Sequence, residues 1–308
     1  MAWKEEFWAS IKSFDTEEKL DLYFYRPFGF LIAKVAKVLR MSPTMLTFIG
    51  LILGVASGFY FYHNESNLSL TIASVLLVMA GVFDSSDGQL ARMGGKSTKL
   101  GLVLDGLCDN FVFASAYIGS TLTLYSLYAP LVIWPIAFLA GFCHSLESSM
   151  LDFYNREYLY FGYGKVNGDY WNHTLQEARK EKRASAGLEE SFFWALRFSW
   201  LWQQNKCTSR SDEQRYLLQK LVNGDKKISE EVQQLYREHN RFILRCWRLL
   251  GPNFHTILII LCAFARRFDW YLIEADIVFL MIALFVLRFF QKKQDDKLFA
   301  QLRARNFG

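Results

Sequence analysis

Apolar residues in this 308-residue chain gather in blocks of about 20, and this clustering restricts the possible folds more than any other feature. A helix of that length crosses the hydrocarbon core of a bilayer, whereas a soluble core needs no such runs. The blocks lie near residues 43–62, 70–92, 100–124, 253–265 and 273–290, with a further block that ends near residue 152. The sequence therefore predicts an all-α, polytopic membrane protein with six transmembrane helices.

The polar segments around these blocks set the expected topology. An N-terminal cytosolic and interfacial region covers residues 1–42 and includes an amphipathic helix at 17–40. Four spans follow at 43–152, and then a mostly helical cytosolic insertion at 153–248, before the fifth span. Two further spans (249–291) and a basic cytosolic tail (292–308) complete the expected order. The basic segments then share the cytoplasmic face, as the positive-inside rule requires, with Arg266 and Arg267 as the exception. The N-terminus lacks the apolar run of a signal peptide, so we expect the first span to direct insertion.

Charge and cysteine content exclude several classes of function. The net charge of +5 fits basic flanks that meet anionic lipid headgroups, and no arginine-rich or base-stacking motif points to nucleic acid. The five cysteines are odd in number and lack CxxC or CxxH spacing. We therefore expect neither a disulfide framework nor a zinc site.

Four aspartates interrupt the second and third apolar blocks. Asp84 and Asp87 are three residues apart, and Asp105 and Asp109 are four apart, so each pair lies on one face of its helix. Such residues are costly at bilayer depth and usually mark a functional site. If the two helices face each other, the carboxylates repel unless divalent cations compensate them, and all-oxygen ligands favour magnesium, manganese or calcium.

Small residues and one arginine accompany these carboxylates. Gly88, Ala91 and Gly101 would let a bulky ligand approach the backbone, although small residues also serve close packing of membrane helices. Arg92 ends the second block, where its guanidinium could bind phosphate oxygens in a bidentate manner. Metal, arginine and a glycine-lined pocket together indicate a substrate that contains a diphosphate.

The complete pattern, Asp84-x2-Asp87-Gly88-x2-Ala91-Arg92-x8-Gly101-x3-Asp105-x3-Asp109, resembles the signature of the CDP-alcohol phosphotransferase (CDP-alcohol phosphatidyltransferase) family of membrane enzymes. The resemblance extends upstream to the stretch SPTMLTFIGLILG, with Pro43, Thr47 and Gly50 in familiar places. The family often has asparagine at or beside the position of Thr44, so this extension departs from the pattern. The insertion at 153–248 lies outside the family core.

The resemblance implies a role for each matched position. Two divalent ions, Mg²⁺ or Mn²⁺, would be bound by Asp84, Asp87, Asp105 and Asp109. The CMP moiety of a CDP-linked substrate would be bordered by Thr47, Gly88, Ala91, Arg92 and Gly101. Asp109 would be the general base for an acceptor hydroxyl that attacks the β-phosphorus, with release of CMP. The family also implies phospholipid biosynthesis, a homodimer, and an active site that faces the cytoplasm.

The signature does not decide which substrate carries the lipid. Our first interpretation is transfer from CDP-diacylglycerol to a small polar alcohol, and the alternative is transfer from a CDP-alcohol to diacylglycerol or ceramide. Arg156 and Lys165 are candidate acceptor residues, although each could equally be a snorkelling interfacial anchor. The neighbouring acids Glu147 and Asp152 argue against a strongly anionic acceptor. A cation transporter is an alternative of another class, because intramembrane aspartates also occur in ion pathways.

Overall fold

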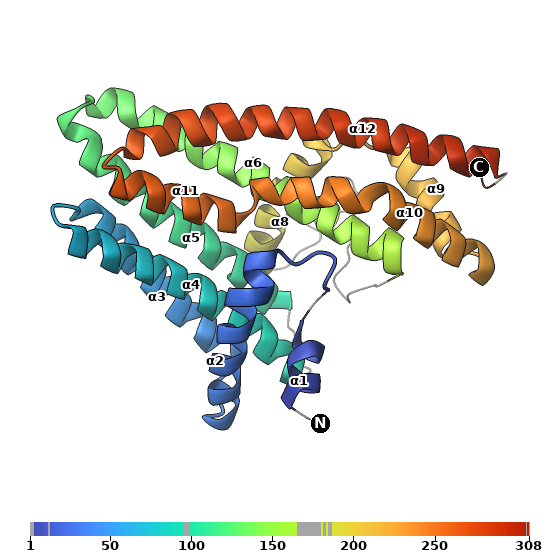
Figure 1. Ribbon diagram of the computed structural model, residues 1–308, viewed down its shortest axis with the longest axis horizontal. Helices are drawn as coiled ribbons and strands as arrows, with labels where there is room; N and C mark the ends of the chain where they lie inside the picture. Colours follow the sequence, from blue (N-terminus) through green and yellow to red (C-terminus); the bar gives the residue numbers. More distant parts are fainter. Residues whose placement is uncertain are drawn as a thin grey trace. The chain divides into compact units, whose positions relative to one another are not determined.

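The computed structural model describes residues 3–11, 13–94, 99–164, 180, 183, 187–305 and 307 (Figure 1). Every secondary-structure element in these residues is a helix, which confirms the predicted all-α class. The chain divides into two compact units, one made of Met1–Cys143 with Pro252–Val278 and the other of His144–Gly251 with Phe279–Gly308.

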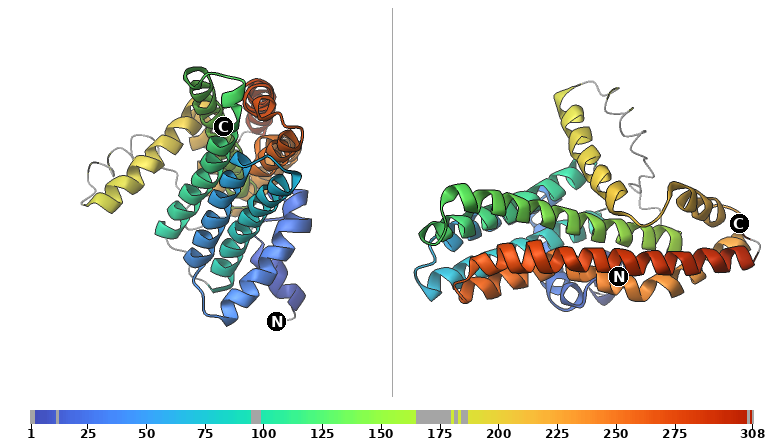
Figure 2. Two further views of the ribbon diagram at one scale, coloured as in Figure 1. Left: turned by 90° about the vertical axis from the view of Figure 1, so that its left-hand side faces the viewer. Right: turned by 90° about the horizontal axis from the view of Figure 1, so that it is seen from above.

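Helices from both ends of the sequence build the first unit. Its members are α1 (Trp3–Ser10), the π-helix η1 (Asp21–Tyr25), α2 (Arg26–Val38), α3 (Pro43–Tyr62), α4 (Asn67–Gly94), α5 (Lys99–Thr123), the short 3₁₀ helix η2 (Leu124–Ser126), the start of α6 (Pro130–Tyr163), α11 (Pro252–Phe264) and most of the π-helix η4 (Trp270–Leu280). Helix α3 packs along both α4 and α5, and the end-on view in Figure 2 shows these helices side by side.

Local sequence explains where α3 begins and how closely it packs. The Ser42 hydroxyl accepts a hydrogen bond from the Met45 amide, and Pro43 occupies the first turn, where its missing N–H is not needed. Farther along, a Cβ added to Gly119 of α5 would lie 2.0 Å from the Gly58 carbonyl oxygen of α3. Glycine therefore permits the close backbone approach that membrane helices use for packing.

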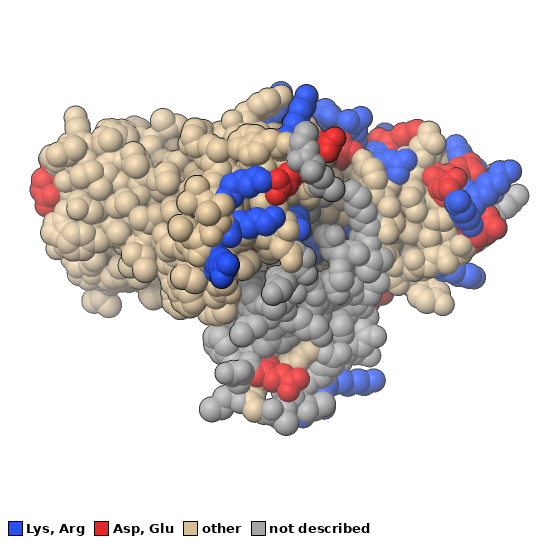
Figure 3. All heavy atoms as spheres, turned by 90° about the horizontal axis from the view of Figure 1, so that it is seen from below, with Lys and Arg blue, Asp and Glu red and all other residues tan. Residues whose placement is uncertain are grey.

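The outer face of α3 is apolar. Its exposed large side chains recur every three or four residues, namely Met45, Phe48, Ile52, Val55, Phe59 and Tyr62. Figure 3 shows a broad surface of uncharged atoms over this part of the first unit. A stripe of this kind suits contact with lipid, because soluble monomers rarely expose large apolar patches.

Within the described residues, four helical stretches are long and apolar enough to cross a membrane: Pro43–Tyr62, Asn67–Gly94, Pro130–Tyr163 and Lys226–Phe264. The first two coincide, within a few residues, with the first two predicted spans. Helix α2 precedes them and also exposes an apolar row, made up of Phe28, Leu31, Val35, Val38 and Leu39. This row agrees with the amphipathic helix predicted at 17–40.

The second unit contains the end of α6, α8 (Leu188–Cys207), α9 (Asp212–Val222), α10 (Lys226–Trp247), the 3₁₀ helix η3 (Arg248–Leu250) and α12 (Met281–Ala304). Arg210, between α8 and α9, lies at its centre with no exposed side-chain surface. It pairs with Glu157 of α6 and, at 2.5 Å, with Asp295 of α12. Attraction to Asp295 and Glu157 outweighs the effect of burial and raises the pKa of Arg210 well above its usual value.

Helix α6 extends beyond residue 152, the expected end of the fourth span, into the segment predicted to be a mostly helical insertion. It continues for a further three turns to Tyr163, because its last part carries large aromatic side chains that pack on α10. Tyr154 stacks on Trp247 with ring centroids 4.4 Å apart, and Tyr158 packs near Tyr236. The helix stops at Gly164, whose φ of 60° suits glycine best.

Candidate active site

The first two predicted metal ligands lie on α4, where α3 packs against it. Asp87 is buried, Asp84 is partly exposed, and Thr47 of α3 donates a hydrogen bond to the Asp87 carboxylate. A Cβ at Gly50 would lie 3.3 Å from the Ala80 carbonyl oxygen, so α3 approaches the α4 backbone closely here. Packing of α3 on α4 thus fixes the orientation of one motif carboxylate.

Helix α5 brings a third carboxylate to the same place. The Asp109 side chain is exposed, and it is close enough to Asp84 and Asp87 for the three charges to repel one another. Asp105 and Gly101 belong to α5, one and two turns before Asp109, but their surroundings lie outside the described residues. Three of the four predicted carboxylates are thus near enough to interact electrostatically in the described part of the chain. Oxygen ligands of this kind are those that hard divalent cations such as Mg²⁺ or Mn²⁺ prefer.

The predicted CMP-binding residues on α4 lie one turn beyond these acids. The Arg92 guanidinium folds back over Gly88, where an added Cβ would lie 3.3 Å from Nη1 and 3.4 Å from Nη2. Arg92 also interacts electrostatically with Asp87 and Asp84. Ala91 precedes Arg92 and is partly exposed. A phosphate beside Gly88 would meet the guanidinium directly, and a larger residue at position 88 would displace it.

A second arginine, in the segment predicted to form the interfacial helix at 17–40, borders the motif. Arg26 of α2 donates to Glu17 from Nε (2.9 Å) and Nη2 (2.8 Å), and its Nη1 donates to the Ser85 hydroxyl at 3.2 Å. Burial acts to lower the pKa of Arg26, but the Glu17 carboxylate outweighs it and raises that pKa above its usual value. Glu17 and Arg26 have no periodic spacing, so no sequence pattern indicated this pair.

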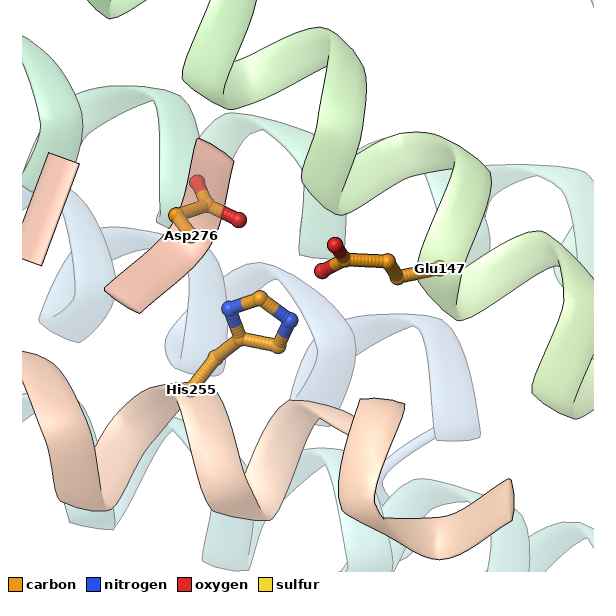
Figure 4. A group of neighbouring side chains, drawn as sticks. All are labelled: Glu147, His255 and Asp276. Atoms are coloured by element: carbon orange, nitrogen blue, oxygen red, sulfur yellow. The ribbon is translucent and has the colours of Figure 1, made fainter. Parts of the chain in front are cut away.

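A buried polar cluster lies elsewhere in the first unit. The Tyr117 hydroxyl donates to Asp276 at 2.5 Å and lies 3.0 Å from the Tyr271 hydroxyl, which is 3.1 Å from Nδ1 of His255. Figure 4 shows two of these residues, His255 on α11 and Asp276 on η4. Sequence spacing could not reveal this cluster, because its members come from distant segments.

The two candidate acceptor residues have different outcomes. Arg156 belongs to the second unit and forms an ion pair with Asp152 at 2.6 Å, one turn away on α6. Asp152 also accepts hydrogen bonds from Trp200 and Gln204 of α8. The charge of Arg156 is thus balanced by its neighbour. Lys165 lies outside the described residues.

Comparisons with known proteins agree with this site. Residues 40–162 match the family model of CDP-alcohol phosphatidyltransferases. An archaetidylinositol phosphate synthase of Pyrococcus horikoshii is 32% identical over 108 residues, which cover 35% of this chain and 52% of the relative. A phosphatidylinositol phosphate synthase of Corynebacterium glutamicum is 34% identical over 117 residues, or 36% of this chain and 51% of the relative. The matched part of the chain thus spans about half the length of these two relatives.

Proposed function

We propose that this chain, whose residues 40–162 match the family model of CDP-alcohol phosphatidyltransferases, transfers a substituted phosphate group from a CDP-linked donor to an alcohol hydroxyl and releases CMP. The observation that carries this proposal is the position of the Arg92 guanidinium over Gly88, next to Asp87, whose carboxylate accepts a hydrogen bond from Thr47. These residues lie inside the segment that matches the family. The product would be a phospholipid, in agreement with the names of the two relatives.

Each residue of the site then has a chemical task. Two divalent ions, held by Asp84, Asp87, Asp105 and Asp109, would neutralise the diphosphate and stabilise the departing CMP. Thr47 orients the Asp87 carboxylate through its hydrogen bond. Arg92 binds the phosphate oxygens in the space beside Gly88, while Ala91 and Gly101 border the nucleotide.

Asp109 performs the proton transfer. Its exposed carboxylate is accessible to an incoming alcohol, as a general base requires. As the acceptor hydroxyl attacks the β-phosphorus, its proton passes to Asp109, a new P–O bond forms, and the P–O bond to CMP breaks. Because Asp109 is placed on α5 and the acids Asp84 and Asp87 on α4, the reacting groups approach from two helices.

We propose CDP-diacylglycerol as the donor and a small polar alcohol as the acceptor. The relatives' printed products contain inositol phosphate, which adds a phosphorylated polyol to the candidates. The acids Glu147 and Asp152 argue against such an anionic acceptor. So does the ion pair with Asp152, because it already balances the charge of Arg156. Transfer of a headgroup from a CDP-alcohol to diacylglycerol or ceramide is the alternative donor arrangement. A cation transporter would use the carboxylates but would leave the match over 40–162 unexplained.

The membrane arrangement that we propose keeps six spans. The four apolar helical stretches and the family support an integral membrane protein. Helices α3, α4, α5 and α6 would be the first four spans, and α11 and η4 with α12 the last two. Residues 153–248 would form the cytosolic insertion, the site would face the cytoplasm, and two copies of the chain would form a homodimer.

Purified protein in detergent with Mg²⁺ or Mn²⁺ tests the reaction. One set of assays supplies CDP-diacylglycerol with alcohols that include inositol and inositol phosphate. The other supplies CDP-alcohols with diacylglycerol or ceramide. CMP is measured, and the lipid product is identified by mass. A new phospholipid in the first set of assays supports the proposal. Product only in the second set would show that the donor is a CDP-alcohol instead. Ion flux through proteoliposomes without release of CMP would show that the protein is a transporter.

A further inference from the structure

The N-terminal segment, residues 3–21, precedes the family-matched part of the chain and folds onto the first unit. Its helix α1 packs against α4 and α2. Glu6 pairs with Lys34 and, at 3.5 Å, with Lys37 of α2. At the other end of the segment, Asn253 of α11 donates to Glu18 at 3.0 Å and to Asp21 at 2.9 Å. Ion pairs and hydrogen bonds therefore hold both ends of the segment in place.

The middle of this segment meets the end of the catalytic motif. Ser10, the last residue of α1, is 1% exposed, and its hydroxyl accepts a hydrogen bond from Nε2 of the fully buried Gln89 at 3.0 Å. The carbonyl oxygen of Ser10 accepts a hydrogen bond from Nε of Arg92. One residue thus contacts two successive turns of α4, and one of its two partners is the arginine expected to bind phosphate.

The hydrogen bond to Ser10 fixes the orientation of the Arg92 guanidinium. With Nε bound to a backbone carbonyl, the guanidinium directs Nη1 and Nη2 over Gly88, on the side of the aspartates. Paired N–H groups of this kind match two oxygens of one phosphate. Arg26 lies near enough to repel Arg92, so the fixed acceptor also opposes displacement of Arg92 by its neighbour. A side chain that is held in its binding geometry loses less entropy when the ligand arrives.

We propose that the N-terminal segment positions Arg92 for the phosphate of the nucleotide, with Ser10 and Gln89 as the positioning residues. This inference rests on the proposed function and deepens it. The residues that set nucleotide affinity then include a part of this chain outside residues 40–162. Neither Ser10 nor Gln89 touches the substrate; both act through the guanidinium of Arg92.

Binding of CMP to the full-length protein in detergent with Mn²⁺ tests the proposal by titration calorimetry. Ser10→Ala removes the hydroxyl and leaves the buried Gln89 amide without this acceptor, so the segment loosens around Arg92. We expect about five- to tenfold weaker CMP binding. Ser10→Thr keeps the hydroxyl and should restore most of the affinity. Lys4→Ala, an exposed change on the same helix, is the matched control and should bind CMP like the wild type.

A double-mutant cycle separates positioning from a general loss of structure. In an Arg92→Met background, Ser10→Ala should change CMP affinity little, because the residue through which it acts is absent. In turnover, Ser10→Ala should raise the KM for the CDP-linked donor and leave the KM for the alcohol unchanged. Equal CMP binding by Ser10→Ala and wild type, or the same loss in both backgrounds, would overturn the inference while the proposed function stands. Wild-type protein that binds no CMP would refute the proposed function itself.

Discussion

Replacing Gly119 by alanine should separate α3 from α5 and misplace Asp109, the proposed base. A methyl group at this position would lie 2.0 Å from the Gly58 carbonyl oxygen and 2.9 Å from its carbonyl carbon. Ordinary contact begins at 3.4 Å. The obstacle is backbone, so no side chain can move aside, and the helices must shift apart by about 1 Å or more.

The shift has two measurable consequences. Overpacking of this kind costs about 1–3 kcal/mol of stability. Asp109 lies on the same helix as Gly119, about 15 Å along its axis, so a displaced α5 carries the base away from Asp87 and Thr47. A misplacement of about 1 Å can reduce turnover by about 100-fold.

The assay compares Gly119→Ala with Gly141→Ala in the rate of CMP release and in thermal unfolding. Gly141, in α6, has nothing within 4 Å of an added Cβ, so its replacement should leave activity unchanged. It should also stabilise the helix slightly, because alanine has the higher helix propensity. A Gly119→Ala variant with activity within twofold and an unfolding temperature within about 1 °C of the wild type would refute the steric reasoning.

Three further outcomes are expected. Asp109→Asn should abolish CMP release yet retain more Mn²⁺, measured by electron paramagnetic resonance, than Asp84→Asn; near-normal turnover would contradict the role of base. Arg210→Met should lower the free energy of unfolding by about 3–5 kcal/mol, because two buried carboxylates lose their cation, and an unchanged denaturation midpoint would contradict this. Hydrogen bonding from Arg267 lowers the pKa of Asp269 below 3.8, so this pair stabilises the fold at neutral pH and the contribution is lost as pH falls through the folded-state pKa. Arg267→Gln should therefore flatten the dependence of the unfolding temperature on pH between about 5 and 3, and an unaltered profile would exclude this linkage.

Several features could be read from the sequence because their causes are local. The run from Pro43 to Tyr62 forms α3 with those bounds, since Ser42 caps it and its apolar length matches a membrane span. The spacing of the aspartates placed each pair on one helical face, and the resemblance agrees with the family model that matches residues 40–162. Helix periodicity and residue type act within a few turns, so a single segment carries enough information to predict them.

Other features depended on segments that are distant in sequence. Arg26 reads as one more interfacial cation, yet it binds Glu17 and contacts the motif through Ser85. The aromatic residues near the end of α6 pack against aromatic residues on α10, which lie more than 70 residues later in the sequence. Hydropathy predicts neither contact, because in each case the residue that stabilises the folded state by this contact lies outside the local sequence.

The sequence by itself indicated the chemistry that we propose for this protein: apolar runs that fit a membrane, carboxylates for divalent metals and an arginine for phosphate. Only the tertiary structure decided how those groups are held, with Thr47 against Asp87 and the Ser10 carbonyl against Arg92. The physical reason is the range of the forces involved. Propensity and hydropathy act along the chain, whereas a hydrogen bond between two helices exists only after packing has brought donor and acceptor within about 3 Å.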